Sequence, residues 1–309
     1  MDSAKKKYLI IGAGGVGANL AAFLTLSGKE VALIARGANL EALQTNGLWL
    51  KSDLLGEKRV QPINAWAEED YAEYPDVIFL CTKTYGIEAV IPFLKRVTTP
   101  NTLIIPLLNG FHIGRAIQRE LTVGTVLEGC IYILGTLLEP GVVSQQNAIF
   151  RIVFGLPKGG KELNLKAQME GVQEDLKASG IKATLSDDIE RDTFMKWSFI
   201  SATALVGAYF NVPMGVIQHD EKIRALFIAL SKESEALAFA MGMELTKDLT
   251  TANLEVLDKT AEESTSSLQK DLVKGKASEI DELVFKMITL GNEYRVPMGT
   301  YEKLSRKFK

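Results

Sequence analysis

The spacing of apolar residues changes near residue 187 of this 309-residue chain. Before that point, short β-branched runs alternate with helix-like segments, a pattern typical of a parallel sheet flanked by helices. The predicted strands are residues 8–11, 30–35, 77–81, 102–106, a piece near 125–131, and 150–155. An apolar helix over residues 15–27, ended by Gly28, joins the first two strands into a β-α-β unit.

After residue 187 the apolar residues recur at helical spacing, and no segment has the alternation of a strand. The predicted helices are residues 189–210, 220–241, 250–257, 262–273 and 279–294. We therefore predict an α/β protein in which a Rossmann domain with a doubly wound parallel sheet (residues 1–186) precedes an all-α domain (residues 187–309). The cleft between the two domains is the expected active site.

A glycine-rich loop directly follows the first predicted strand and opens the first predicted helix. Its residues are Gly12, Ala13, Gly14, Gly15, Val16 and Gly17. In such a fingerprint the first glycine allows a tight turn, the second lets backbone amides approach a pyrophosphate, and the third lets helix and strand pack closely. The amides and partial positive charge at the helix N-terminus then bind the phosphates. The loop predicts a bound dinucleotide.

The residue after the second predicted strand indicates which dinucleotide binds. An NAD enzyme would carry a carboxylate there for the ribose 2'-hydroxyl, whereas this chain has Arg36 between Ala35 and Gly37. A guanidinium pairs with a 2'-phosphate through two parallel hydrogen bonds, so NADP is the expected cofactor. The alternative is an arginine that is merely solvated in a turn.

Charge and cysteine content exclude several classes of partner. The chain has 35 basic and 38 acidic residues and a net charge of -3, which disfavours nucleic acid and anionic membranes. The two cysteines, Cys81 and Cys130, provide neither a disulfide framework nor a zinc motif, so a reducing, cytoplasmic location is expected. No apolar stretch reaches the roughly 20 residues of a membrane span, and glycines interrupt the apolar run after residues 5–7, which argues against a secretory signal.

The glycine loop is also similar to that of the enzymes that adenylate ubiquitin-like proteins. Those proteins place acidic residues after the second strand, where this chain has Arg36. They also usually carry a catalytic cysteine, whereas Cys81 lies in an apolar predicted strand, where an inert thiol is expected. This class is therefore disfavoured.

Lysine and carboxylate groups are better candidates for catalysis than the two histidines, which lack metal-ligand spacing. Lys196 lies between Met195 and Trp197 on an apolar helix, where an ammonium can stabilise and protonate the alkoxide formed when a ketone is reduced. The alternative is a lysine that extends to solvent. Glu279 begins the last long helix, where Ser278 and Asp281 have capping-box spacing, and its alternative role is to interact with the helix dipole.

Taken together, these residues resemble the ketopantoate reductase family, which reduces 2-dehydropantoate to pantoate with NADPH in pantothenate biosynthesis. The resemblance covers nearly the whole chain. It is carried by residues 12–17, Arg36, 81–84 (Cys-Thr-Lys-Thr), 108–110 (Leu-Asn-Gly), 195–197 (Met-Lys-Trp), 266–271 (Ser-Ser-Leu-Gln-Lys-Asp) and 278–281 (Ser-Glu-Ile-Asp).

The resemblance implies a role for each matching residue. Lys196 would be the general acid, and Glu279 the carboxylate that binds the substrate and orients the lysine. The other matches are Asn109 near the nicotinamide and the substrate, Lys83 in the cofactor site, Ser267 at the substrate carboxylate, and Arg36 at the 2'-phosphate.

The lysine helix departs from the family pattern where substrate specificity is expected. The family usually has asparagines four and eight residues after the lysine, and this chain has Ile200 and Ala204 on that face. Thr203 would replace one of these contacts. Losing a polar substrate contact changes discrimination by orders of magnitude, so a relative acting on another 2-oxo acid stays open. A protein that senses NADPH without turnover and a homodimer are also open.

Overall fold

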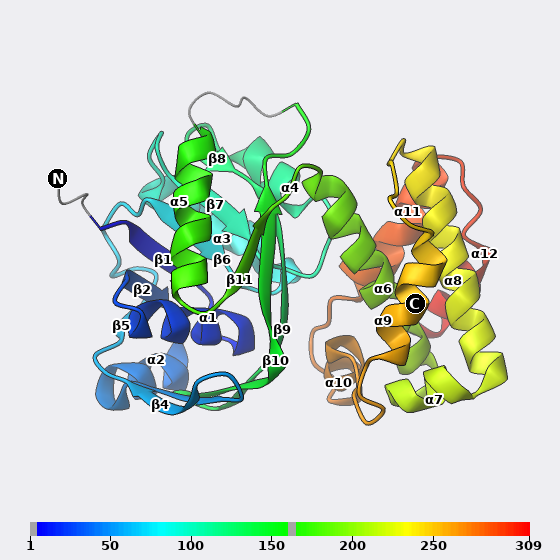
Figure 1. Cartoon of the computed structure of the whole chain (residues 1–309), viewed down its shortest axis with the longest axis horizontal. Helices are drawn as coiled ribbons and strands as arrows, with labels where there is room; N and C mark the ends of the chain where they lie inside the picture. Colours follow the sequence, from blue (N-terminus) through cyan, green and yellow to red (C-terminus); the bar gives the residue numbers. More distant parts are fainter. Residues whose placement is uncertain (1–4, 160–164) are drawn as a thin grey trace. The chain divides into compact units, whose positions relative to one another are not determined.

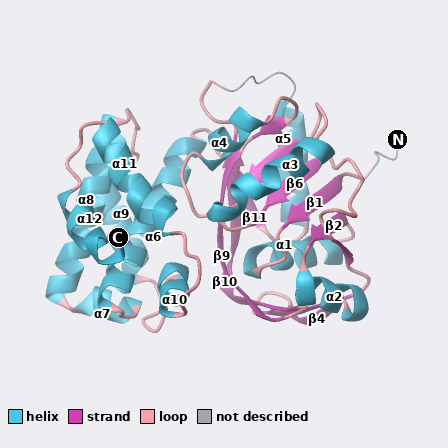
Figure 2. Cartoon of the chain, turned by 180° about the vertical axis from the view of Figure 1, so that it is seen from behind, coloured by secondary structure: helices cyan, strands magenta, loops and turns pink. Residues whose placement is uncertain are grey.

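The computed structural model describes residues 5–159 and 165–309. It divides into two compact units. Unit 1 comprises Met1–Leu108 and His112–Glu190, and unit 2 comprises Asn109–Phe111 and Arg191–Lys309. Figures 1 and 2 show that the strands belong to unit 1 and that the bulk of unit 2 is helical. The predicted fold class, a Rossmann sheet followed by an all-α region, is confirmed.

Unit 1 contains a six-stranded sheet with the order β5-β2-β1-β6-β7-β8, in which every neighbouring pair is parallel. From β1 the sheet extends to both sides, through β2 and β5 on one side and through β6, β7 and β8 on the other. This is the doubly wound order that the sequence predicted. Its strands are β1 (Lys7–Ile11), β2 (Glu30–Ile34), β5 (Asn64–Trp66), β6 (Val77–Leu80), β7 (Leu103–Pro106) and β8 (Thr125–Val126).

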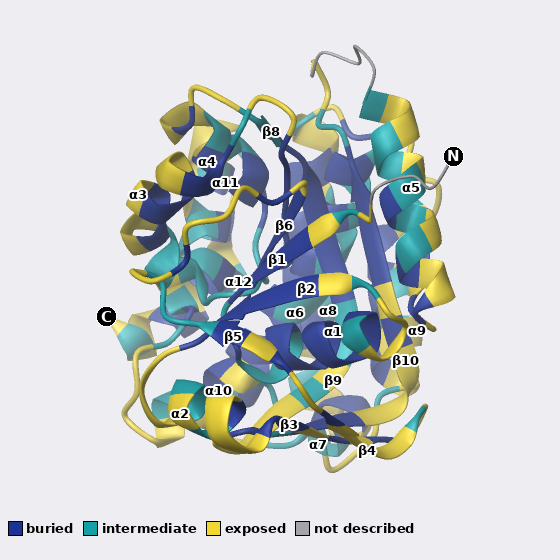
Figure 3. Cartoon of the chain, turned by 90° about the vertical axis from the view of Figure 1, so that its left-hand side faces the viewer, coloured by how far each residue is buried: buried dark blue, intermediate teal, exposed yellow. Residues whose placement is uncertain are grey.

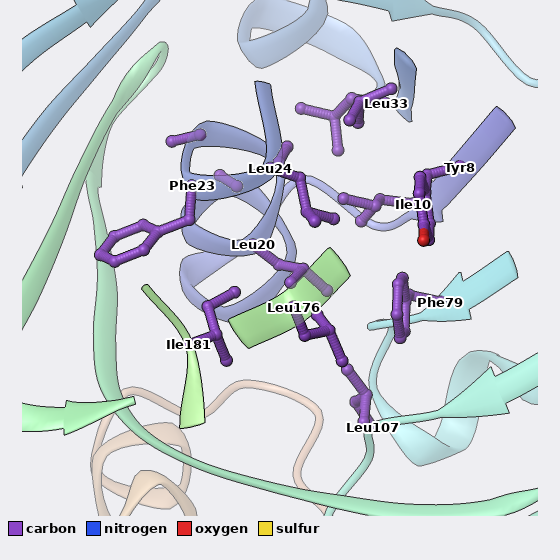
Figure 4. Close-up of a cluster of buried hydrophobic side chains, with 14 of the residues drawn as sticks. Tyr8, Ile10, Leu20, Phe23, Leu24, Leu33, Phe79, Leu107, Leu176 and Ile181 are labelled. Carbon is purple, nitrogen blue, oxygen red and sulfur yellow. The ribbon is translucent and has the colours of Figure 1, made fainter. Parts of the chain in front are cut away.

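Both faces of this sheet are buried, as expected for a parallel sheet. Along β1, Tyr8 and Ile10 pack into one hydrophobic cluster, while Leu9 and Ile11 pack into another. Helix α1 (Gly15–Leu26) contributes to the first cluster, whose side chains Figure 4 shows. Helices α3 (Ile87–Val97) and α4 (Ile113–Glu120) contribute to the second. In Figure 3 the central strands are accordingly drawn almost entirely as buried.

A second, five-stranded sheet in unit 1 was not predicted. Strand β10 pairs with β9 in antiparallel fashion and with β3 and β11 in parallel, and β3 pairs with β4. The predicted strand near residues 125–131 is split between β8 of the first sheet and β9 of the second. The strands are β3 (Leu48–Ser52), β4 (Gly56–Val60), β9 (Glu128–Glu139), β10 (Val142–Gly155) and β11 (Lys182–Leu185).

Helix α1 packs between the two sheets, against β1 and β2 on one side and β9 and β10 on the other. Its residues 17–24 are all buried, which explains why this helix is apolar around its whole circumference. Gly28 follows it with φ +80°, as its predicted capping role requires. Helix α2 (Gly37–Asn46) packs near β5, and α5 (Leu165–Ala178) packs on β11.

The helical part of unit 2 surrounds one hydrophobic cluster. Helix α6 has the predicted bounds, and its first two residues belong to unit 1. The predicted helix over residues 262–273 begins only at Ser267, because the Ser266 hydroxyl caps it by accepting from Gln269 N–H at 3.1 Å. The elements are α6 (Ile189–Phe210), α7 (Met214–His219), α8 (Glu221–Ala240), α9 (Leu249–Asp258), α10 (Ser267–Val273), the π-helical turn η2 (Asp281–Phe285), α11 (Lys286–Glu293), α12 (Gly299–Ser305) and the 3₁₀ turn η3 (Arg306–Phe308). Across residues 5–159 and 165–309, no helix is both long and apolar enough to cross a membrane.

Candidate active site

The first and third glycines of the loop after β1 are required by the packing of unit 1. Gly12 has φ +105°, and a Cβ there would lie 2.9 Å from the Cys81 carbonyl oxygen. A Cβ at Gly17 would lie 2.0 Å from the Gly12 carbonyl oxygen. These are the tight turn and the close helix-strand approach that the sequence predicted. Burial raises the pKa of the Cys81 thiol, so this cysteine has no reactive thiolate.

The two middle glycines of the loop differ in their surroundings. Gly14 precedes α1, and a Cβ there would meet no atom within 4 Å, so its face of the loop is open to a ligand. At Gly15 a Cβ would lie 2.4 Å from the Gly135 carbonyl oxygen of β9. Gly15 therefore lets α1 cross the second sheet, a role that the fingerprint itself does not predict.

Arg36 and Lys83 follow β2 and β6, the neighbours of β1, so they lie at the carboxyl edge of the sheet with the glycine loop. Arg36 is exposed, and its guanidinium makes no hydrogen bond or ion pair with any residue that the structure describes. Lys83 is half-buried at the turn η1 (Thr84–Gly86). The adjacent Thr82 hydroxyl is buried and has no hydrogen-bond partner in the described part of the chain. This edge therefore carries two cationic side chains and a buried hydroxyl that has no partner among the described residues.

In unit 2, the structure brings two predicted site residues together. The Lys196 ammonium on α6 donates a hydrogen bond to the Asn109 side-chain oxygen at 2.9 Å, although 87 positions separate them. Both residues were predicted for the site by resemblance, and their contact was not predicted. An amide oxygen held against an ammonium fixes the direction of its remaining N–H bonds.

Two charged residues that the sequence analysis missed hold the segment that carries Asn109. Phe111 N–H donates to Glu282 Oε1 at 3.1 Å, and the Lys286 ammonium donates to the Phe111 carbonyl oxygen. Lys286 also pairs with Glu282 at 2.7 Å. Burial raises the pKa of Glu282, and the Lys286 ammonium only partly opposes this shift. In the sequence this pair resembles any i,i+4 pair on a helix surface, so the pattern did not distinguish it.

Glu282 belongs to the π-helical turn η2, which packs on α6, and Lys286 begins α11 directly after it. The Glu282 carbonyl oxygen accepts from the Trp197 indole N–H at 3.1 Å, and the Leu283 carbonyl oxygen accepts from the Ser201 hydroxyl. Glu279 precedes the turn and is 4% exposed. The capping box predicted for Ser278 is not formed, because the helix begins in the π turn without a side-chain cap.

Comparison with known proteins identifies the family. The ketopantoate reductase PanE/ApbA model matches residues 8–159, and the model of its C-terminal region matches residues 188–309. The chain belongs to the ketopantoate reductase PanE/ApbA family. It is therefore a nicotinamide-dependent oxidoreductase with a small-molecule substrate, as the sequence predicted.

Individual relatives agree with this assignment. The chain is 27% identical over 318 residues to a 2-dehydropantoate 2-reductase of Mesorhizobium japonicum, covering 96% of this chain and 94% of the relative. A solved PanE/ApbA family ketopantoate reductase of Ralstonia eutropha has a TM-score of 0.87 at 23% identity, covering 97% and 96% of the two chains. A D-mandelate dehydrogenase solved with NADH and anilino(oxo)acetate has the same TM-score and coverage at 20% identity, which shows a shared fold.

Two positions on α6, where ketopantoate reductases usually have asparagine and this chain does not, lie in apolar surroundings. Ala204 is fully buried, and Ile200 packs partly buried against the same cluster. Thr203 is 2% exposed, and its hydroxyl donates to the Phe199 carbonyl oxygen of its own helix at 2.8 Å. Ser267 is exposed at the first position of α10. No described contact joins Thr203 or Ser267 to the lysine-asparagine pair, so their substrate-binding roles stay predictions.

The two histidines belong to different units of the chain. His112 has φ +57° and precedes α4 in unit 1, and exposed His219 faces Glu262 at 3.1 Å. Within the ranges 5–159 and 165–309, no group of three or more His, Cys, Asp or Glu residues is arranged to hold a metal ion. The candidate catalytic groups described in unit 2 are therefore a lysine, an asparagine and carboxylates.

Proposed function

We propose that this chain reduces 2-dehydropantoate to pantoate with NADPH, in the cytoplasm and as a step of pantothenate biosynthesis. The hydrogen bond between Lys196 and Asn109 carries the proposal, because it gives the candidate proton donor a fixed direction. The family membership and the Mesorhizobium relative support the substrate. A homodimer stays a prediction.

The residues at the carboxyl edge of the sheet fit NADPH. The open face at Gly14 and the N-terminus of α1 suit a pyrophosphate. Exposed Arg36, which pairs with none of the described residues, suits a 2'-phosphate. The buried Thr82 hydroxyl, which lacks a partner among the described residues, suits a further polar contact. By resemblance to the family, Lys83 and Asn109 are also proposed to contact NADPH. NADPH bound here would supply the hydride.

The protein's own residues then manage charge and protons at the substrate. Lys196 donates a proton to the alkoxide oxygen that forms at C2 of the 2-oxo acid, and its positive charge stabilises that oxygen. Asn109 accepts one ammonium N–H and so directs the other two. Buried Glu279 holds a substrate hydroxyl or the lysine itself. Ser267 binds the substrate carboxylate in this scheme.

The test is the absorbance of NADPH at 340 nm, followed by that of NADH, with purified protein and 2-dehydropantoate. NADPH-selective oxidation is expected, and Lys196→Ala should lower kcat by roughly 100-fold or more, as loss of a general acid does. Lys303→Ala, which removes an exposed lysine of the same unit, is the matched control and should leave kcat unchanged. Near-normal turnover by a folded Lys196→Ala protein would exclude Lys196 as the proton donor.

A second candidate function is the reduction of another 2-oxo acid. It is favoured by the apolar surroundings of Ile200 and Ala204, where family members usually offer amide groups. A panel of branched and aromatic 2-oxo acids, assayed with the same variants, separates the two candidates. A substrate preferred over 2-dehydropantoate, with the same dependence on Lys196, would support it. Tight NADPH binding with no turnover on any member would instead favour a sensor.

A further inference from the structure

We propose that Glu282 and Lys286 are positioning residues of the reaction, which hold the segment Asn109–Phe111 so that Asn109 directs the Lys196 ammonium. The inference rests on the proposed function, in which Lys196 is the proton donor. Neither residue touches Asn109 or Lys196 in a described contact. Both act through the backbone of Phe111.

The backbone of Phe111 is held by both side chains. This residue is fully buried, so its N–H and C=O groups must find partners inside the protein. Glu282 accepts from the N–H and Lys286 donates to the C=O, while the two side chains pair with each other. We call this arrangement of Glu282 and Lys286 on the Phe111 backbone the clamp. Its two positions cannot be exchanged, because an acceptor is needed at position 282 and a donor at position 286.

The Phe111 ring packs on the helix that carries the lysine. It lies edge-on to Phe194, with ring centroids 5.2 Å apart, and is stacked on Trp197, with centroids 5.5 Å apart. Phe194 and Trp197 flank Lys196 on α6. The clamp thus fixes the segment relative to α6 itself, and so fixes Asn109 relative to Lys196.

The clamp is also attached to the same helix. The Trp197 indole donates to the Glu282 carbonyl oxygen, and the Ser201 hydroxyl donates to that of Leu283. These bonds tie carbonyl groups of the π turn η2 to α6, and such turns occur frequently at functional sites. Helix α6, the π turn and the Asn109 segment form one network.

The network affects the reaction because the hydrogen bond between Lys196 and Asn109 depends on the position of the segment. The Lys196–Asn109 bond is 2.9 Å long, and a shift of the segment by about 1 Å would break it, because N–H···O hydrogen bonds span about 2.7–3.2 Å. Misplacement of a catalytic group by about 1 Å lowers a rate by roughly 100-fold. We therefore expect Glu282→Ala to lower kcat by roughly 100-fold. The KM for NADPH should change far less than kcat, because the glycine loop and Arg36 belong to unit 1.

Three further variants separate positioning from a merely structural ion pair. Glu282→Gln keeps an acceptor oxygen for Phe111 N–H and should stay within about threefold of the wild-type kcat, a change of less than 1 kcal/mol. The charge swap E282K/K286E restores an ion pair but presents a donor to a donor, so it should not recover activity. Asp258→Ala, which breaks the exposed pair with Arg224 in the same unit, is the matched control and should leave kcat unchanged. Recovery by the charge swap would overturn the proposal.

A double-mutant cycle tests whether Glu282 acts through Asn109. In an Asn109→Ala background, Glu282→Ala should lower kcat by less than about threefold further, because residues acting through one contact are not additive. Independent, multiplied losses would overturn the proposal that Glu282 acts through Asn109. Circular dichroism on every variant confirms that kinetics are compared between folded proteins.

Hydrogen exchange of the Phe111 amide, measured by NMR, provides a readout that does not depend on turnover. The amide should be protected in the wild type and in Glu282→Gln, and should exchange faster in Glu282→Ala. An exchange rate that Glu282→Ala leaves unchanged would overturn the clamp. Failure of the proposed function would appear differently, as a wild-type protein that oxidises no NADPH with any 2-oxo acid.

Discussion

Gly14 and Gly15 are adjacent in the loop after β1, but only one of them is crowded. A methyl group at Gly15 would lie 2.4 Å from the Gly135 carbonyl oxygen, whereas one at Gly14 would meet nothing within 4 Å. We expect Gly15→Ala to lower the free energy of unfolding by about 1–3 kcal/mol, because the backbone of β9 cannot yield without repacking. Urea denaturation of the full chain measures this loss.

Gly14→Ala is the matched variant for that measurement. It should keep the free energy of unfolding within about 1 kcal/mol of the wild type, since alanine is only moderately disfavoured before a helix. Its NADPH affinity should fall, because the methyl group occupies the open face proposed for the pyrophosphate. Equal stability losses in the two variants would contradict the packing argument.

Arg36 is the residue proposed to choose the cofactor. Removing a guanidinium that pairs with a phosphate costs about 1.5–3 kcal/mol, so Arg36→Ala should weaken NADPH binding by roughly 10- to 100-fold. NADH lacks the 2'-phosphate, so its affinity should not change. Fluorescence titration with both cofactors measures the ratio. Arg119→Ala, an exposed arginine of α4, should change neither affinity, and an equal loss for both cofactors in Arg36→Ala would contradict the assignment.

At the scale of elements, the sequence predicted those whose pattern is local. Strand β1 and helix α6 have continuous apolar patterns, and α6 was predicted with its observed bounds. The second sheet was missed because β4 is exposed at four of its five positions, and because the pairing of β3 with distant β10 depends on tertiary contacts. The π turn was missed because its carbonyl oxygens accept hydrogen bonds from Trp197 and Ser201 on α6. The local sequence of the turn does not reveal these distant donors.

Glu282 in the π turn should make the free energy of unfolding depend on pH. Burial raises the pKa of Glu282 above its ordinary value of 4.5, while Lys286 lowers it and Glu279 raises it further. As the pH rises through 4.5 towards the folded-state pKa, the unfolded chain releases a proton that the folded chain retains. The wild-type free energy of unfolding should therefore fall with rising pH in this window, relative to Glu282→Gln.

Urea denaturation of both proteins between pH 4 and pH 8 gives this difference. Subtracting the Glu282→Gln curve removes contributions from every other titrating group, so the remaining slope reports position 282. A difference that rises with pH in this window would mean that the ion pair with Lys286 outweighs burial. The circular dichroism of the two proteins at pH 8 controls for altered structure.

At the scale of the whole molecule, three residues belong to a unit that otherwise begins more than 70 positions later. Asn109–Phe111 follow β7, yet they are part of unit 2. A single boundary at 186/187 leaves these three residues outside the C-terminal domain, and the domain bounds 1–186 and 187–309 stay predictions. The resemblance identified Asn109 and Lys196 but not Glu282 or Lys286, because only the fold brings this segment and the π turn together.

Phe111 provides the last test, because its side chain completes the core of unit 2 from a distant part of the chain. It is fully buried between Phe194 and Trp197, so Phe111→Ala should lower the free energy of unfolding by about 3–5 kcal/mol. The loss should appear as faster hydrogen exchange in α6 and α11 and not in strands β1 and β6 of unit 1.

Phe239→Ala is the control, because it removes a phenylalanine that is 62% exposed. Its free energy of unfolding should stay within about 0.5 kcal/mol of the wild type. If exchange accelerated in the unit 1 sheet alone, Phe111 would belong energetically to unit 1, and the Asn109 segment could not be the fixed part of unit 2 on which the direction of Lys196 depends.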